Sequence, residues 1–155
     1  MSSIASILAR FFLSAFFLIS GINKIIYWRE ADKQFMHTLS DWQAHLASVE
    51  YLQTLLNEGV AWSPIVLLLM TFIEILGGLF LLFGIKERLG AFFLLLCLIP
   101  STLFFHPFWF FHGIEQELQM SLFLRNIAII GGLLLVIAHG LRRNASGERF
   151  PCQYD

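Results

Sequence analysis

Residues 63–85 read SPIVLLLMTFIEILGGLFLLFGI, a run in which Glu74 is the only charged side chain. About 20 consecutive apolar residues are enough for an α-helix to cross the hydrocarbon core of a bilayer. Pro64 stands near the start of the run, where a proline fits the first turn of a helix. The run therefore predicts a membrane-spanning helix, and this prediction decides the fold class.

Three further segments have the same apolar character, at about residues 4–26, 89–106 and 122–141. Pro100 inside the third predicts a kink. The chain of 155 residues is 57% hydrophobic and 14% charged, whereas soluble domains are about 45–50% apolar and about 25% charged. The sequence therefore predicts an all-α transmembrane four-helix bundle, built as a single membrane domain.

Composition also excludes several classes of protein. The net charge of −1 offers no basic surface for nucleic acid. The two cysteines, Cys97 and Cys152, form no CxxC pair, so a disulfide-stapled secreted scaffold is excluded. Residues 1–9 carry no Lys or Arg, which favours an uncleaved first helix over the alternative of a cleaved signal peptide.

Charge returns in residues 27–62, between the first two predicted spans. Apolar residues recur there at helical spacing: Trp42, Leu46, Val49, Leu52 and Leu56. Ser40 or Asp41 is placed to cap the start of this helix, and Gly59 to end it. An apolar stripe opposite a mixed-charge face favours an amphipathic helix in the membrane interface or capping the bundle. The alternative is a short helix packed on a partner. Residues 142–155 form a polar tail.

The distribution of Lys and Arg predicts that both termini are cytoplasmic. In this orientation the inner side receives Lys86, Arg88, Arg142, Arg143 and Arg149, with Arg10 toward it. The outer side receives Lys24, Arg29, Lys33 and Arg125.

Four charged residues lie in or beside the spans: Arg10, Lys24, Glu74 and Arg125. A charge at mid-membrane costs roughly 2.5–3.5 kcal/mol on insertion scales, so such residues normally face a bundle interior and form pairs. At a rise of about 1.5 Å per residue, Glu74 can reach either Arg10 or Arg125. Arg125 is the favoured partner, because Arg10 and Lys24 can each extend to a nearer interface. Two interpretations follow: a structural ion pair, or a proton-relay or ligand-anchoring carboxylate.

A second polar cluster is predicted near the outer face. Its members are Asn23, Lys24, His106, His112, Glu115, Arg125 and Asn126. Such a ring of donors could hold a quinone carbonyl, a lipid headgroup or an anion. The alternative is that these side chains only anchor the helices at headgroup level.

No metal or haem site is predicted. His106 and His139 lie at opposite ends of their spans, which does not suit a haem held by two histidines. His106, His112 and Glu115 lack the i,i+4 spacing that would bring them to one face of a helix. Small residues allow helices to approach closely in membranes. We therefore expect close packing at Gly21, Gly77, Gly78, Gly131 and Gly132.

Four short motifs recur in this order in a known family: SGINK (20–24), EILGGL (74–79), HPFW (106–109) and FLRNIAIIGGL (123–133). With Arg10 and Gly84, they make the chain resemble the DoxX family of small four-helix membrane proteins over nearly its whole length. The residue before Asn126 is commonly Lys in that family and is Arg125 here. The exchange keeps the charge and changes the hydrogen-bond geometry.

The resemblance implies a bacterial inner-membrane protein linked to redox chemistry, since family members are associated with thiosulfate:quinone oxidoreductase or quinol-oxidase complexes. The first hypothesis is a non-catalytic membrane subunit or anchor of a quinone-linked redox complex, with the bilayer and a redox protein or a second copy as partners. The alternative is a protein that binds a quinone, a lipid or another small molecule with Glu74 and Arg125. A third is a minimal proton-coupled transporter, with Glu74 as the coupling carboxylate and Pro100 as a hinge. No intrinsic catalytic activity and no other cofactor are expected.

Overall fold

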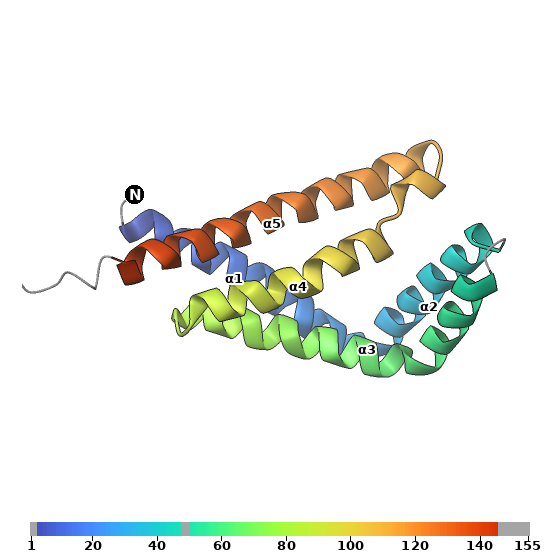
Figure 1. The fold of residues 1–155 in the computed structure, drawn as a ribbon, viewed down its shortest axis with the longest axis horizontal. Helices are drawn as coiled ribbons and strands as arrows, with labels where there is room; N and C mark the ends of the chain where they lie inside the picture. The colour runs from blue at the N-terminus through green and yellow to red at the C-terminus, as the bar shows by residue number, and fades with distance from the viewer. Residues whose placement is uncertain (1–2, 48–49, 146–155) are drawn as a thin grey trace, which may run out of the picture.

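The computed structural model of the chain describes residues 3–47 and 50–145. Within them it is helical throughout, with no strand. The elements in chain order are α1 (Ser3–Ile26), α2 (Trp28–His45), α3 (Glu50–Phe83), α4 (Glu87–Phe105), the short 3₁₀ helix η1 (Phe108–Phe110) and α5 (Ile114–Ala145). Figure 1 shows α1, α3, α4 and α5 running along the long axis, with α2 at one end.

Four of these helices, α1, α3, α4 and α5, are long and apolar enough to cross a membrane. Their outward faces carry large, exposed apolar side chains, including Phe12, Phe72, Phe92 and Leu124. A soluble monomer rarely leaves so much apolar surface facing water. The predicted all-α transmembrane bundle is therefore confirmed.

The buried core lies where α1, α3, α4 and α5 meet. Its members are Phe17, Leu81, Ala91, Leu94, Leu98 and Leu133. Glycines lie at the helix contacts: Gly21 faces Ile75, Gly77 faces Leu94, Gly78 faces Leu18 and Gly132 faces Leu13, with the nearest side-chain atom within 3.2 Å of an added Cβ. Gly131 differs from the prediction, because it is exposed and the described residues leave open space around it.

The segment between the first two spans folds as a helical hairpin, and the expected single helix between residues 40 and 59 is wrong. The chain turns at Leu46 and Ala47, after α2, and α3 begins at Glu50. Gly59 does not end a helix. It lies within α3 where this helix packs against α2, and an added Cβ would make an ordinary van der Waals contact, 3.6 Å from a methyl group of Leu39.

Pro64 lies inside α3 and does not open a helix as predicted. Figure 1 shows that α3 bends between the part beside α2 and the part beside α1. Proline causes such bends because it removes a backbone donor and crowds the preceding turn. The 34 residues of α3 span about 51 Å, well beyond the roughly 30 Å of the hydrocarbon core. The first turns of α3 therefore extend past the membrane with α2.

The last helix is longer at both ends than the predicted span of 122–141. It begins at Ile114, so the polar patch around Glu115 and Gln119 forms its first turns. It continues to Ala145, into the segment expected to be a polar tail, and residues 146–155 lie outside the described residues. Both α2 and these first turns of α5 lie at one end of the bundle, beside the cavity described next.

Candidate functional site

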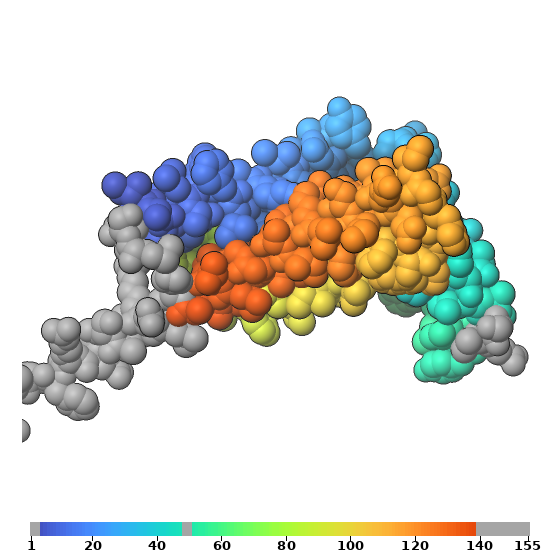
Figure 2. Space-filling model, turned by 90° about the horizontal axis from the view of Figure 1, so that it is seen from above, coloured from blue at the N-terminus to red at the C-terminus, as the bar shows by residue number. Residues whose placement is uncertain are grey.

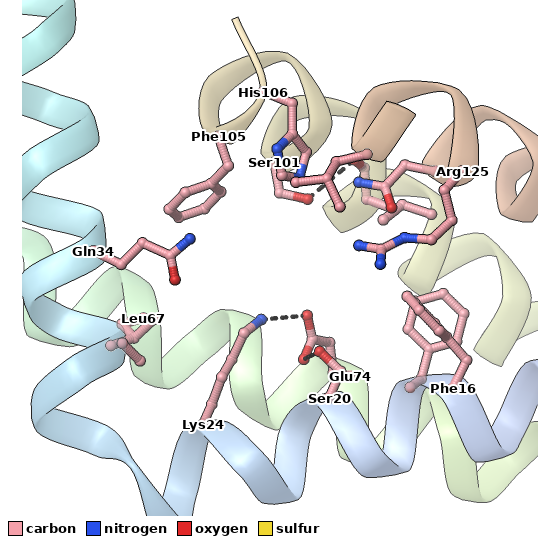
Figure 3. Close-up of a pocket in the computed structure, with 15 residues that line it drawn as sticks. Phe16, Ser20, Lys24, Gln34, Leu67, Glu74, Ser101, Phe105, His106 and Arg125 are labelled. Carbon is pink, nitrogen blue, oxygen red and sulfur yellow. Dashed lines mark hydrogen bonds and ion pairs between the residues drawn. The ribbon is translucent and has the colours of Figure 1, made fainter. Parts of the chain in front are cut away.

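A cavity of about 330 Å³ lies within the end of the bundle that adjoins α2. Its lining residues come from all five α-helices and the residue that follows α4: Phe16, Phe17, Ser20, Lys24, Ala31, Gln34, Leu67, Glu74, Leu98, Ser101, Phe105, His106, Leu122, Arg125 and Asn126 (Figure 3). Small-molecule sites typically measure about 300–1,000 Å³ and combine apolar walls with a few polar groups. The cavity has both properties.

Glu74 projects into this cavity from α3 and forms an ion pair with Lys24 of α1, with the two charged atoms 2.5 Å apart (Figure 3). The Ser20 hydroxyl donates a longer hydrogen bond of 3.3 Å to the other carboxylate oxygen. The favoured Glu74–Arg125 pair is therefore wrong. Lys24 turns inward along α1 because a carboxylate inside the bundle compensates its charge better than an apolar surrounding does.

Arg125 extends from α5 toward the same cavity, on the side opposite Glu74 in Figure 3. Its guanidinium carbon lies 5.9 Å from the centre of the Phe16 ring, in a cation–π contact. Within the described part of the chain, no carboxylate lies within ion-pair distance of Arg125. Because Lys24 and Glu74 compensate each other, the cavity keeps one uncompensated positive charge.

His106 and Asn126 complete the polar wall. A ring nitrogen of His106 lies 2.9 Å from the side-chain oxygen of Gln119, which fixes the ring at the edge of the cavity. Asn126 is buried and follows Arg125 directly on α5. The sequence grouped Glu74 with Arg125, and grouped His106 and Asn126 with Arg125 in a second cluster. The structure brings all four to one cavity.

Part of the wall was missed from the sequence, because it comes from α2. Ala31 and Gln34 line the cavity from this helix. Phe35 of α2 is buried and its ring lies 5.3 Å from that of Phe104 in α4. Trp42 donates a 2.9 Å hydrogen bond from its indole nitrogen to the Phe104 carbonyl oxygen. The sequence does contain a signal for a helix in this segment, namely apolar residues at helical spacing. The prediction failed because it placed the boundaries of that helix at residues 40 and 59.

Other predicted members lie outside the cavity. Arg10 is near the opposite end of the bundle, where it pairs with Glu87 of α4. Asn23 lines a neighbouring cavity between α1 and α2, and His112 and Glu115 are exposed. Among the described residues, no three His, Cys, Asp or Glu side chains are grouped as a metal site would require. The side chain of His139 lies outside the described residues.

The arrangement suits an electron-rich, partly apolar ligand. Arg125 offers several N–H donors in a fixed plane, and Asn126 adds a neutral amide. Phe16 and Phe105 provide ring faces and edges on the same cavity. A ligand with carbonyl, carboxylate or phosphate oxygens would meet the uncompensated positive charge.

Comparison with known proteins identifies the family of the chain. No curated protein and no solved structure matches the chain. The model of the DoxX family matches residues 5–107, well over half of the sequence. The matched part includes Lys24, Glu74 and His106, whereas Arg125 and Asn126 follow it. On this match, the chain belongs to the DoxX family.

Proposed function

We propose that this membrane protein binds the head of a quinone-type molecule in the cavity and acts as the membrane subunit of a redox complex. The observation that carries the proposal is the Arg125 guanidinium at the cavity without an acidic partner among the described residues. An unpaired charge at membrane depth is costly, and such residues mark ligand or ion sites. A bound oxygen acceptor would offset that cost.

The donor set fits a quinone head. A quinone ring carries carbonyl oxygens that accept hydrogen bonds, and Arg125 and Asn126 stand on one wall to donate them. Its flat, apolar ring matches the aromatic lining at Phe16 and Phe105. When bound, a quinone supplies the electron-accepting chemistry, and this chain supplies the position and the hydrogen bonds.

The Lys24–Glu74 pair has a different role in this proposal. Its charges compensate each other, so it adds little net attraction for a ligand. It places an ammonium donor and a carboxylate acceptor side by side at the cavity, next to the Ser20 hydroxyl. The pair therefore orients the polar side of the head, whereas Arg125 provides most of the affinity.

The test measures binding of the ubiquinone ring without its tail by calorimetry, with the protein in lipid nanodiscs. A charge-assisted hydrogen bond contributes about 1.5–3 kcal/mol, so Arg125→Gln should weaken binding by about tenfold to a hundredfold. Arg125→Lys keeps the charge and should lose less. The matched control is Arg29→Gln, at an exposed position of α2 away from the cavity. Equal affinity of the wild type and Arg125→Gln would contradict the proposal.

A second observation supports a role in a larger complex. The hairpin of α2 and the first turns of α3 projects from one end of the bundle in two views (Figures 1 and 2). Exposed polar side chains on it, including Arg29, Lys33 and His37, offer a surface to a water-soluble partner.

Purification in mild detergent tests this second part of the proposal. A redox enzyme should co-purify with the chain and should be lost when Lys33 and His37 are replaced by Ala. Those substitutions lie outside the cavity, so quinone affinity should stay unchanged. Recovery of the chain without a redox enzyme would count against the complex and leave the binding proposal standing.

We also propose that the protein lies in the inner membrane of a bacterium, with both termini in the cytoplasm. The support is the bias of Lys and Arg toward the α3–α4 turn and the C-terminal segment. In this orientation the hairpin and the cavity lie toward the outer side, opposite the α3–α4 turn.

A further inference from the structure

The walls of the cavity do not close equally on all sides. Toward the N-terminal half of α1, the helices α1 and α5 touch: an added Cβ at Gly132 would lie 3.2 Å from a methyl group of Leu13. Farther along, Phe16 and Arg125 form their cation–π contact. These two contacts close the space between α1 and α5 at the end of the cavity that is farther from α2.

Beyond the Phe16–Arg125 contact, the two helices diverge toward the end of the bundle where α2 lies (Figure 1). The cavity lies in this widening space, with Ser20 and Lys24 on the α1 side and Leu122 on the α5 side. Arg125 is exposed although it also lines the cavity. Because Arg125 lies on α5 beside the space where α1 and α5 diverge, its exposure indicates that the cavity opens between these two helices.

The outer end is covered in part by α2, although Gln34 at this end is exposed, as Arg125 is. Phe35 of α2 is only 6% exposed and its ring packs against Phe104 and Phe105. Gln34 and Phe105 stand at this end of the cavity in Figure 3. A neighbouring cavity of about 280 Å³ between α1 and α2 shares Lys24 and Gln34 with the first. It is the alternative path from the cavity to water.

The surroundings of the α1–α5 opening are apolar. Gly132 and Arg125 are seven positions apart on α5, which corresponds to about 10.5 Å along the helix axis. The opening therefore begins about that far from the Leu13–Gly132 contact. Exposed side chains in the neighbouring turns are large and apolar, among them Ile19 on α1 and Leu118 on α5. An opening with such neighbours in a membrane protein faces hydrocarbon chains.

We infer that the ligand enters from the bilayer, through the opening between α1 and α5, and that it belongs to the lipid-soluble class: a polar ring head with a long hydrocarbon tail. The head lies beside Arg125 and Glu74, and the tail remains in the opening and continues into the lipid. This inference rests on the proposed function and adds the route and the tail. Leu122 lines the cavity from α5 and is the residue through which we test this route.

The experiment compares decylubiquinone with the ubiquinone ring that lacks a tail, using captured nanodiscs of phosphatidylcholine and surface plasmon resonance. Leu122→Trp narrows the opening and should slow association of decylubiquinone by about tenfold, within the range seen among variants of one site. Leu122→Ala widens it and should speed association, which keeps the test valid if the larger residue impairs folding. The matched control, Leu124→Trp, adds the same ring to the same helix on its exposed face and should change nothing.

A second control tests the path through the neighbouring cavity. Asn23→Trp narrows that cavity and should leave association of decylubiquinone unchanged. A slower rate in Asn23→Trp together with unchanged rates in both Leu122 variants would overturn the inference and place the route on the water side. Arg125-dependent binding of the tail-free ring with no effect of Leu122 would reject the route alone. Failure of the wild type to bind either quinone would reject the proposed function and the route together.

Discussion

A side chain at residue 77 would have no room between α3 and α4. A Cβ atom there would lie 2.5 Å from Cγ of Leu94, a branch point rather than a flexible end. Leu94 is fully buried in the core and cannot swing aside. Gly90 on α4 has the reciprocal restriction, since its added Cβ would lie 2.7 Å from Cβ of Phe80. The close approach of these two helices therefore depends on single glycines.

Gly77→Ala should accordingly destabilise the bundle, by about 1–3 kcal/mol as is typical of overpacked cores. Gly131→Ala is the matched control, because residue 131 is exposed and has open space around it within the described residues. It should leave stability unchanged or raise it by up to about 1 kcal/mol through helix propensity. The free energy of unfolding in mixed micelles of a mild detergent and sodium dodecyl sulfate measures both. Equal stabilities of the two variants would refute the packing argument.

The same residues show what a single sequence can predict. The sequence singled out Glu74, Lys24 and Arg125, because charges are rare in apolar segments and each one is visible by itself. It did not predict the Lys24–Glu74 pair, since pairing depends on the rotation of α1 relative to α3. It also assigned Gly131 and Gly132 the same packing role, although adjacent residues on a helix face different directions.

At the scale of the elements, the length of the apolar segments predicts the membrane-spanning helices correctly. Single glycine and proline residues do not predict where those helices begin and end. The predicted spans match α1 and α4 closely, because a turn at Tyr27 ends α1 and the turn at residues 84–86 precedes α4. The sequence predicts a helix end at Gly59 and a helix start at Pro64, yet α3 runs through both. A bend accommodates the proline, and Gly59 lies inside the helix where α3 packs beside Leu39 of α2.

The misplaced helix boundary affects the predicted site more than the predicted fold. Because the predicted helix began near residue 40, the sequence did not predict that α2 forms part of the cavity wall or that Gln34 lines the cavity. Contacts between α2 and α4, such as the Trp42–Phe104 hydrogen bond, join residues far apart in sequence. No local pattern encodes such contacts, so this part of the site required the structure.

At the scale of the whole molecule, orientation decides which leaflet supplies the ligand. The hairpin and the cavity share one end of the bundle, and the α3–α4 turn lies at the other (Figure 1). With the termini in the cytoplasm, the opening between α1 and α5 meets the outer leaflet. A water-soluble partner that docks on the hairpin would then be on the outer side as well.

Cysteine labelling in intact cells tests the orientation. In a variant with Cys97→Ala and Cys152→Ser, a single cysteine is placed at Tyr51 in the hairpin or at Ile85 in the α3–α4 turn, both exposed. A membrane-impermeant maleimide should label Tyr51→Cys in intact cells and Ile85→Cys only after lysis, because Lys and Arg favour the cytoplasmic side of the α3–α4 turn. The reverse pattern would place the cavity toward the inner leaflet. A docking partner would then have to be a cytoplasmic protein, while the route between α1 and α5 would stay as inferred.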